Sequence, residues 1–217
     1  MNLFGGISSL TLGKDDKIFN PSIYKDQSNL NPLYQKTMLF VGDSICQGYG
    51  DQEDLGGYVG RVGRDNVATV YNYGVGGAKI TEISGQSCIC TKIDTMYAEH
   101  PDADYVIMEG GINDADWLGA ASTAEKFGTF DETDFSGNYD KTTFCGAVEY
   151  MFYKASTLFP NAKLGFIIVC KSAKNNNGYF PFAHNYRAYF DMIAILCGKW
   201  GISCLDLWET SPANPSL

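Results

Sequence analysis

One serine in this sequence lies where it could act as a nucleophile. Residues 38–41 form a short apolar run that predicts a buried strand, and the chain continues into Gly42-Asp43-Ser44. A serine at the end of such a strand has its hydroxyl in a crevice at the edge of the sheet, which is where open α/β sheets bind ligands. To attack a carbonyl carbon, Ser44 needs a base that takes its proton and donors that stabilise the resulting oxyanion.

Two further stretches carry suitable donors. Residues 72–77 (Asn-Tyr-Gly-Val-Gly-Gly) form a glycine turn, which could aim a backbone N–H at an oxyanion because no side chain is in the way. Residues 111–114 (Gly-Ile-Asn-Asp) contain an asparagine whose side-chain amide could aim a second. Gly77 and Asn113 are therefore the candidate oxyanion donors.

Each of the three stretches follows a predicted strand. The strands are expected over Thr37–Val41, Val67–Tyr73 and Asp104–Met108, from their apolar, β-branched and aromatic content. Because the carboxyl ends of parallel strands lie at one edge of a sheet, we expect the three candidate residues to meet there.

The remaining elements predict an α/β fold. Two more strands are expected over Leu164–Val169 and Ile202–Leu207, and the first of these is apolar almost throughout, as in a strand buried on both faces. Amphipathic periodicity predicts helices, strongly over residues 144–159 and 186–200 and more weakly over residues 55–65 and 80–97. Regular alternation of strands and helices indicates a parallel sheet with helices on both faces.

Charge and length narrow the class of protein. The chain of 217 residues suits one α/β domain, and its net charge of −9 argues against nucleic acid or an anionic membrane as partner, because both would repel it. No apolar run approaches the roughly 20 residues that span a bilayer. The start of the chain lacks the basic residues and long apolar centre of a signal peptide.

The seven cysteines predict reduced thiols and a cytoplasmic setting. Cys170, Cys197 and Cys204 lie in apolar runs, as small buried residues do. Cys88 and Cys90 are the only close pair, and no second cysteine or histidine pair at metal-ligand spacing accompanies them, so no zinc site is expected.

Taken together, the three stretches resemble the conserved blocks of the SGNH (GDSL) hydrolases, a family of esterases, lipases and carbohydrate deacetylases. The resemblance covers residues 37–207 and matches Gly-Asp-Ser, Asn-x-Gly-x-x-Gly and Gly-x-Asn-Asp in order. It implies Ser44 as nucleophile and Gly77 and Asn113 as oxyanion donors. It also implies a flavodoxin-like three-layer α/β/α sandwich with a mainly parallel five-stranded sheet, no metal or other cofactor, and a small-molecule or carbohydrate ester as substrate.

The fourth family block, Asp-x-x-His after the fifth strand, is missing. The chain has two histidines, and the residues three positions before them are Tyr97 and Pro181, so neither His100 nor His184 matches the block. We expect residues 1–36 to be an arm or linker and residues 37–217 to be a hydrolase-like domain that is truncated at its C-terminal end. The triad Asp and His would then follow Leu217, unless His184 substitutes as the base.

Other interpretations remain open from the sequence. In one interpretation, Ser44 is a helix cap and has no catalytic role. In another, a domain that lacks its catalytic base binds a glycan or a protein instead of hydrolysing an ester. The glycine turn could cradle the phosphate of a flavin, since flavodoxin-like sheets bind such ligands at this edge.

The polar segment 116–141 supports two smaller expectations. Its acidic residues lack the glycine that a calcium-binding loop needs, so a solvated loop is expected. Its aromatic residues could form one wall of a substrate cleft; they are Trp117, Phe127, Phe130 and Tyr139.

Overall fold

The computed structural model of the protein describes residues 31–51, 56–83, 88–115, 124–169 and 186–210, and it shows the expected parallel sheet. All of the strand pairs are parallel, and the strand order is β2-β1-β3-β4-β5. The strands are β1 (Thr37–Val41), β2 (Thr69–Asn72), β3 (Tyr105–Glu109), β4 (Lys163–Ile168) and β5 (Ser203–Asp206). This order is the flavodoxin-like one, so the predicted fold class is confirmed.

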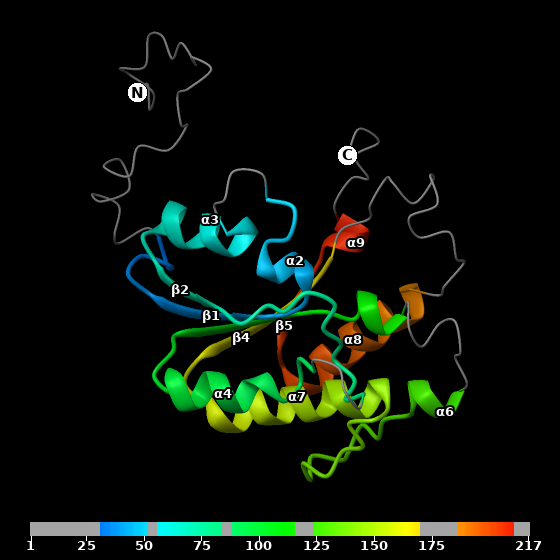
Figure 1. The fold of residues 1–217 in the computed structure, drawn as a ribbon. Helices are drawn as coiled ribbons and strands as arrows, with labels where there is room; N and C mark the ends of the chain where they lie inside the picture. The colour runs from blue at the N-terminus through cyan, green and yellow to red at the C-terminus, as the bar shows by residue number, and fades with distance from the viewer. Residues whose placement is uncertain (1–30, 52–55, 84–87, 116–123, 170–185, 211–217) are drawn as a thin grey trace, which may run out of the picture.

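Helices cover both faces of the sheet, which completes the three layers (Figure 1). The helices α2 (Ser44–Gln47) and α3 (Gly57–Asn66) lie on one face. On the opposite face lie α4 (Lys92–Glu99), α7 (Phe144–Leu158) and α8 (Tyr186–Trp200). Two further short helices are α6 (Ala124–Phe127) and α9 (Leu207–Thr210).

The core is divided by the sheet into a large and a small part. The larger cluster lies between the sheet and α4, α7 and α8, and its biggest fully buried side chains include Phe144, Phe152, Phe166 and Phe190. The smaller cluster lies under α2 and α3 and consists of Met38, Phe40, Cys46 and Val59. The sheet is therefore packed against side chains on both faces. The loops at its carboxyl edge are anchored to this rigid, buried framework.

Two predicted elements differ from the structure. The second strand starts at Thr69 because Val67, at a φ of +54°, ends α3 and the N–H groups of Val67 and Ala68 bond back to that helix. The helix expected over residues 80–97 is present only as α4. Ahead of it, Lys79 and Cys88 form an isolated parallel bridge.

The cysteine expectations are only partly met. Cys197 is buried, Cys204 is exposed, and Cys170 lies outside the described residues. Cys204 lies on β5, which has a neighbouring strand on one side only in the described part of the sheet. The thiols of Cys88 and Cys90 lie 2.7 Å apart in the core. No helix in the described part of the chain is both long and apolar enough to cross a membrane.

Candidate functional site

The three candidate stretches lie next to one another at the carboxyl edge of the sheet. β1 lies between β2 and β3, so the residues after these three strands are neighbours. Two backbone hydrogen bonds extend the pairing beyond β2: the N–H of Tyr73 donates to the carbonyl of Phe40 at 2.7 Å, and that of Val75 to the carbonyl of Gly42 at 3.0 Å. The glycine turn is thereby fixed against the turn that carries Ser44.

Ser44 is the first residue of α2, and Asp43 caps this helix. The Oδ1 atom of Asp43 accepts a hydrogen bond from the N–H of Ile45 at 2.9 Å, which satisfies one free donor at the helix start. α2 ends after one turn at Gly48, which adopts a left-handed conformation. The Ser44 side chain is half-buried, so the serine is held at the sheet edge by a short, capped helix.

The glycine turn contacts α2 directly. The side chain of Asn72 donates to the carbonyl of Cys46 at 2.8 Å and accepts from the N–H of Gly74 at 2.9 Å. A Cβ atom at Gly74 would lie 2.4 Å from the backbone nitrogen of Gln47, so only glycine allows this approach. Gly77 has a φ of +72° and open space around it, as a residue facing a crevice requires.

Asn113 bridges the other two stretches through its side-chain amide. Nδ2 donates to the carbonyl of Ala78 at 2.9 Å and to Oδ2 of Asp43 at 3.4 Å. Asn113 belongs to a helical turn, residues 112–115, which follows β3. Its amide therefore lies between the residue after the glycine turn and the turn that carries Ser44.

Asp114 secures the backbone beyond the glycine turn. Its fully buried carboxylate accepts the N–H of Ile80 at 2.9 Å and that of Thr81 at 2.8 Å. Burial raises the pKa of Asp114, and these two hydrogen bonds oppose that rise. Asn113 therefore joins Ala78 to Asp43, whereas Asp114 fixes the chain that follows Ala78.

The site also contains a buried glutamate that sequence reasoning missed. Glu109, the last residue of β3, is 1% exposed, and its Oε2 accepts the N–H of Asp43 at 3.2 Å. Burial raises the pKa of Asp43 to about 6 and, together with the neighbouring Asp43 charge, raises the pKa of Glu109 well above its usual range. The sequence feature that could have identified Glu109 is a charged residue at the end of an apolar strand.

The hydrogen bonds of the glycine turn bear on the flavin interpretation. The N–H groups of Gly74, Val75 and Ala78 already donate to protein acceptors within and beside the turn. A phosphate cradle needs several such groups aimed at the ligand. The turn therefore favours a site with one or two donors over a phosphate-binding site.

The described histidine lies between a helix and a strand of the sheet. His100 follows α4 as its C-terminal cap. Its ring stacks on Tyr71 with centroids 3.5 Å apart. His184, the other candidate base, lies outside the described residues. Asp206 is placed as a helix cap: its Oδ1 accepts the N–H of Glu209 at 3.0 Å at the start of α9.

The aromatic residues expected in a cleft wall have other neighbours. Phe127 contacts Phe144 and Tyr189 at ring distances of 5.6 and 4.8 Å. Tyr139 packs against Tyr153 of α7 and Trp200 of α8, and Phe130 borders the core. These contacts fasten the segment to the helices, and Phe130 also lines a pocket beside Phe135 and Lys199. Trp117 lies outside the described residues, so the cleft wall stays a prediction.

The acidic residues of the same segment form local turns, as expected of a solvated loop. The carboxylates of Asp131, Asp134 and Asp140 accept hydrogen bonds from the N–H groups two residues further on. Within the described ranges, no three His, Cys, Asp or Glu side chains are grouped so that they could hold a metal ion.

Comparison with known proteins agrees with the fold and the motifs. The model of the GDSL-like lipase/acylhydrolase family matches residues 40–216, and the chain therefore belongs to this family. A serine nucleophile and an oxyanion hole are typical of its members. No curated protein matches the sequence.

Solved structures share the fold at low sequence identity. A protein from Lactobacillus plantarum is 22% identical with a TM-score of 0.65, over 84% of this chain and 82% of that chain. An acetylxylan esterase from Geobacillus stearothermophilus, solved as a catalytic mutant, is 15% identical with a TM-score of 0.52, over 87% and 86% of the two chains. A carbohydrate acetylesterase family member from Sinorhizobium meliloti is 17% identical with a TM-score of 0.51, over 83% and 86%.

Proposed function

We propose that the protein is a serine esterase that hydrolyses its substrate through an acyl-serine intermediate. The observation that carries this proposal is the position of the Asn113 amide, which bonds Ala78, the residue after the glycine turn, and Asp43 beside Ser44. An amide held between a serine at a helix start and a glycine turn has the placement that oxyanion stabilisation requires.

The residues would act in the following roles. The Ser44 hydroxyl attacks the ester carbonyl, and the negative charge that develops on the carbonyl oxygen is stabilised by the backbone N–H groups of Ser44 and Gly77 and by the amide of Asn113. Collapse of the tetrahedral intermediate releases the alcohol and leaves the acyl group on Ser44. Water then attacks the acyl-enzyme through a second tetrahedral intermediate.

The base is proposed to be a histidine oriented by an aspartate, both encoded after Leu217. A serine hydroxyl is a weak nucleophile unless a neighbouring base takes its proton. The ring of His100 stacks on Tyr71 of β2, so we do not propose it as the base of Ser44. His184 is the alternative within the chain, in a segment outside the described residues.

For the substrate, we propose an ester with a short acyl group, borne on a carbohydrate. Support comes from two structures of the same fold, which are named as an acetylxylan esterase and a carbohydrate acetylesterase family member.

The test compares hydrolysis of p-nitrophenyl acetate by the 217-residue chain and by the complete gene product, each with and without Ser44→Ala. We expect hydrolysis that disappears with Ser44→Ala. Activity found only in the complete gene product would place the base after Leu217. The absence of Ser44-dependent hydrolysis from both proteins would overturn the esterase and favour the glycan- or protein-binding module.

Asn113→Ala tests the oxyanion donor. Because removing one such donor typically costs about 10²–10³-fold in kcat, we expect a loss of this size with little change in melting temperature. The matched control is Asn66→Ala at the end of α3, whose side chain bonds Asn31 and the carbonyl of Val62 instead. An unchanged kcat in Asn113→Ala would exclude Asn113 from the proposed role.

A further inference from the structure

The carboxyl group of Glu109 lies directly beneath the turn that carries Ser44. Its Oε2 accepts the N–H of Asp43 at 3.2 Å. A Cβ atom at Gly42 would lie 2.4 Å from the same oxygen, so the carboxyl group fills the space that the glycine leaves. The Gly42–Asp43 peptide, one residue before Ser44, therefore rests on Glu109.

Glu109 and Asp43 form a buried carboxyl pair without a countercharge. Both side chains are at most 1% exposed, and neither has an ion-pair partner among the described residues. The second oxygen of Glu109, Oε1, has no hydrogen-bond partner in the described structure. Two adjacent buried carboxylates cannot both be ionised at low cost, so the pair retains one proton near neutral pH.

The groups around the pair do not neutralise it. Burial raises the pKa of Cys46 in α2 to about 12 and raises that of Tyr58 in α3, so both are uncharged at pH 7. Asp114, in the turn after β3, adds a further carboxyl group, whose pKa is raised by burial although its hydrogen bonds and the nearby Lys79 oppose the rise. Burial, followed by the Asp43 charge, raises the pKa of Glu109 well above its usual range, so the retained proton is shared within the Glu109–Asp43 pair.

The proton matters because Asp43 also holds Asn113. Of the two hydrogen bonds from the Asn113 amide, the one to Ala78 is short at 2.9 Å, and the one to Asp43 is long at 3.4 Å. An oxyanion would take the donor that faces Asp43. With Glu109 ionised, two negative charges would lie beside the developing oxyanion, and Asp43 would compete more strongly for this donor.

We infer that Glu109 is a positioning residue of the proposed esterase: in its protonated form, sharing the proton with Asp43, it supports the Ser44 turn and keeps the Asn113 amide available to the oxyanion. This inference rests on the proposed function. It makes the neutral form of Glu109 the working form, and this consequence can be tested by substitution.

The activity test compares Glu109→Gln with Glu109→Leu at pH 7, using Ser44-dependent hydrolysis of p-nitrophenyl acetate by the complete gene product. Glutamine is neutral and can make the same hydrogen bonds, so we expect it to keep most of the wild-type kcat. Leucine has a similar size but no polar atoms, so we expect kcat to fall by about 10²-fold while KM changes little. An active leucine variant, or a glutamine variant as impaired as leucine, would overturn the inference.

The second test needs no activity. Because the folded state binds the proton of Glu109 more tightly than the unfolded state does, wild-type stability falls as pH rises above the unfolded pKa of about 4.3, and Glu109→Gln removes this loss. We expect the melting temperature of the glutamine variant minus that of the wild type to rise by about 5–10 °C between pH 5 and pH 9. A constant difference would exclude the retained proton, even if the leucine variant does not fold.

Controls separate this inference from the proposed function. Glu149→Gln removes another buried glutamate, one that is paired with Lys199, and should show neither the pH-dependent gain in melting temperature nor a change in kcat. Absence of Ser44-dependent hydrolysis would refute the esterase and with it the positioning role. Ser44-dependent hydrolysis with no effect of Glu109→Leu would refute the positioning role alone.

Discussion

Gly42 shows how tightly single residues of the candidate site constrain one another. Its φ is not in the left-handed region, so backbone conformation does not demand glycine there. A Cβ atom would instead lie 2.4 Å from Oε2 of Glu109 and 2.6 Å from Cβ of Cys46. The glycine of Gly-Asp-Ser is thus required by a glutamate 67 positions away in the chain. At this scale the site depends on three-dimensional neighbours more than on local sequence.

Asp43 gives the first prediction at the residue scale. Burial raises its pKa to about 6 in the folded protein, so the folded state binds its proton more tightly than the unfolded chain does, and this contribution to stability is lost as pH rises from about 4 to about 6. Asp43→Asn keeps the helix cap but cannot titrate. Urea unfolding at pH 4 and pH 7 should show the wild type losing roughly 2 kcal/mol relative to the variant. A pH-independent difference would contradict the raised pKa.

At the scale of elements, Lys199 joins two helices and the segment between α6 and α7. Its ammonium group donates to the carbonyls of Asp131 and Asp134, both at 2.7 Å, and to Oε1 of Glu149 at 2.6 Å. Trp200 donates to the other oxygen of Glu149 at 2.7 Å. The side chains of Lys199 and Glu149 are 5% and 2% exposed, so this ion pair between α8 and α7 is shielded from solvent.

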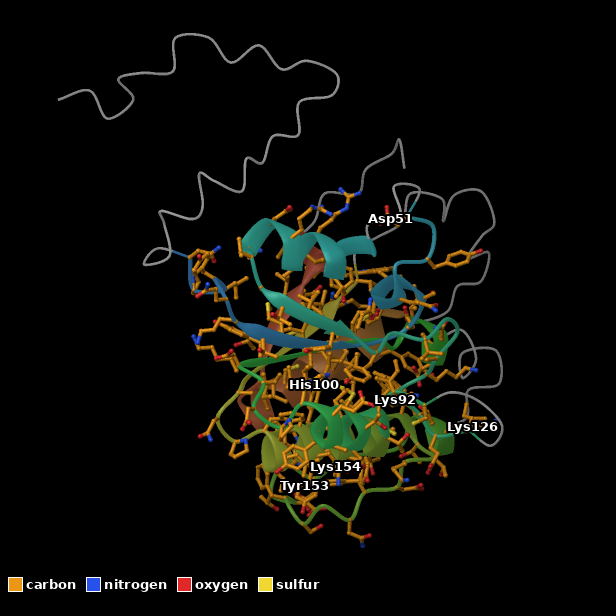
Figure 2. The ribbon with its side chains drawn as sticks, turned by 60° about the vertical axis from the view of Figure 1, so that its left-hand side comes forward. Asp51, Lys92, His100, Lys126, Tyr153 and Lys154 are labelled. Atoms are coloured by element: carbon orange, nitrogen blue, oxygen red, sulfur yellow. The ribbon has the colours of Figure 1, made fainter. Side chains whose placement is uncertain are left out.

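Lys199→Met should therefore destabilise the fold strongly. Removing one partner leaves the Glu149 charge buried without a counterion, which typically costs about 3–5 kcal/mol. The matched control is Lys154→Met on the surface of α7 (Figure 2), where the pair with Asp94 is 22% and 50% exposed and should contribute at most about 1 kcal/mol. Urea unfolding of both variants measures the difference. Equal effects would show that the buried pair has no special role.

At the scale of the whole molecule, residues 31–36 are bound to the folded domain. Asn31 donates to the side chain of Asn66 at 3.1 Å, and Leu33 packs against the smaller core cluster. The ammonium group of Lys36 lies 2.8 Å from the Asp104 carboxylate. The domain boundary expected at Thr37 therefore stays a prediction, and these contacts indicate an earlier start.

Two truncations test the start of the domain. The protein without residues 1–30 keeps the contacts of residues 31–36, and the protein without residues 1–36 lacks them. At about 1 kcal/mol per hydrogen bond, together with the burial of Leu33, we expect the shorter protein to unfold with roughly 2–3 kcal/mol less free energy. The measurement is urea unfolding of the two proteins side by side. Equal free energies of unfolding for the two truncated proteins would support Thr37 as the start of the domain.

Much of the architecture was predictable because its signals are local. Apolar runs predicted all five strands to within two residues at each end, and the two long amphipathic patterns predicted α7 and α8. The prediction of a helix over residues 80–97 was mostly wrong. The carboxylate of Asp114, which is distant in the sequence, accepts the N–H groups of Ile80 and Thr81 at the start of this segment. The packing of Phe127 and Tyr139 against α7 and α8 was not predictable, because it joins side chains from different elements.

The sequence by itself determined the family, the parallel sheet and the three motifs at its carboxyl edge, since strand ends and glycine turns are encoded by neighbouring residues. The roles of Ser44, Gly77 and Asn113 in catalysis stay predictions. Only the tertiary structure decided that Glu109 and Asp43 meet beneath Ser44 and lose their contact with water. Their raised pKa values follow from burial and mutual repulsion, which depend on packing between segments that are distant in the chain.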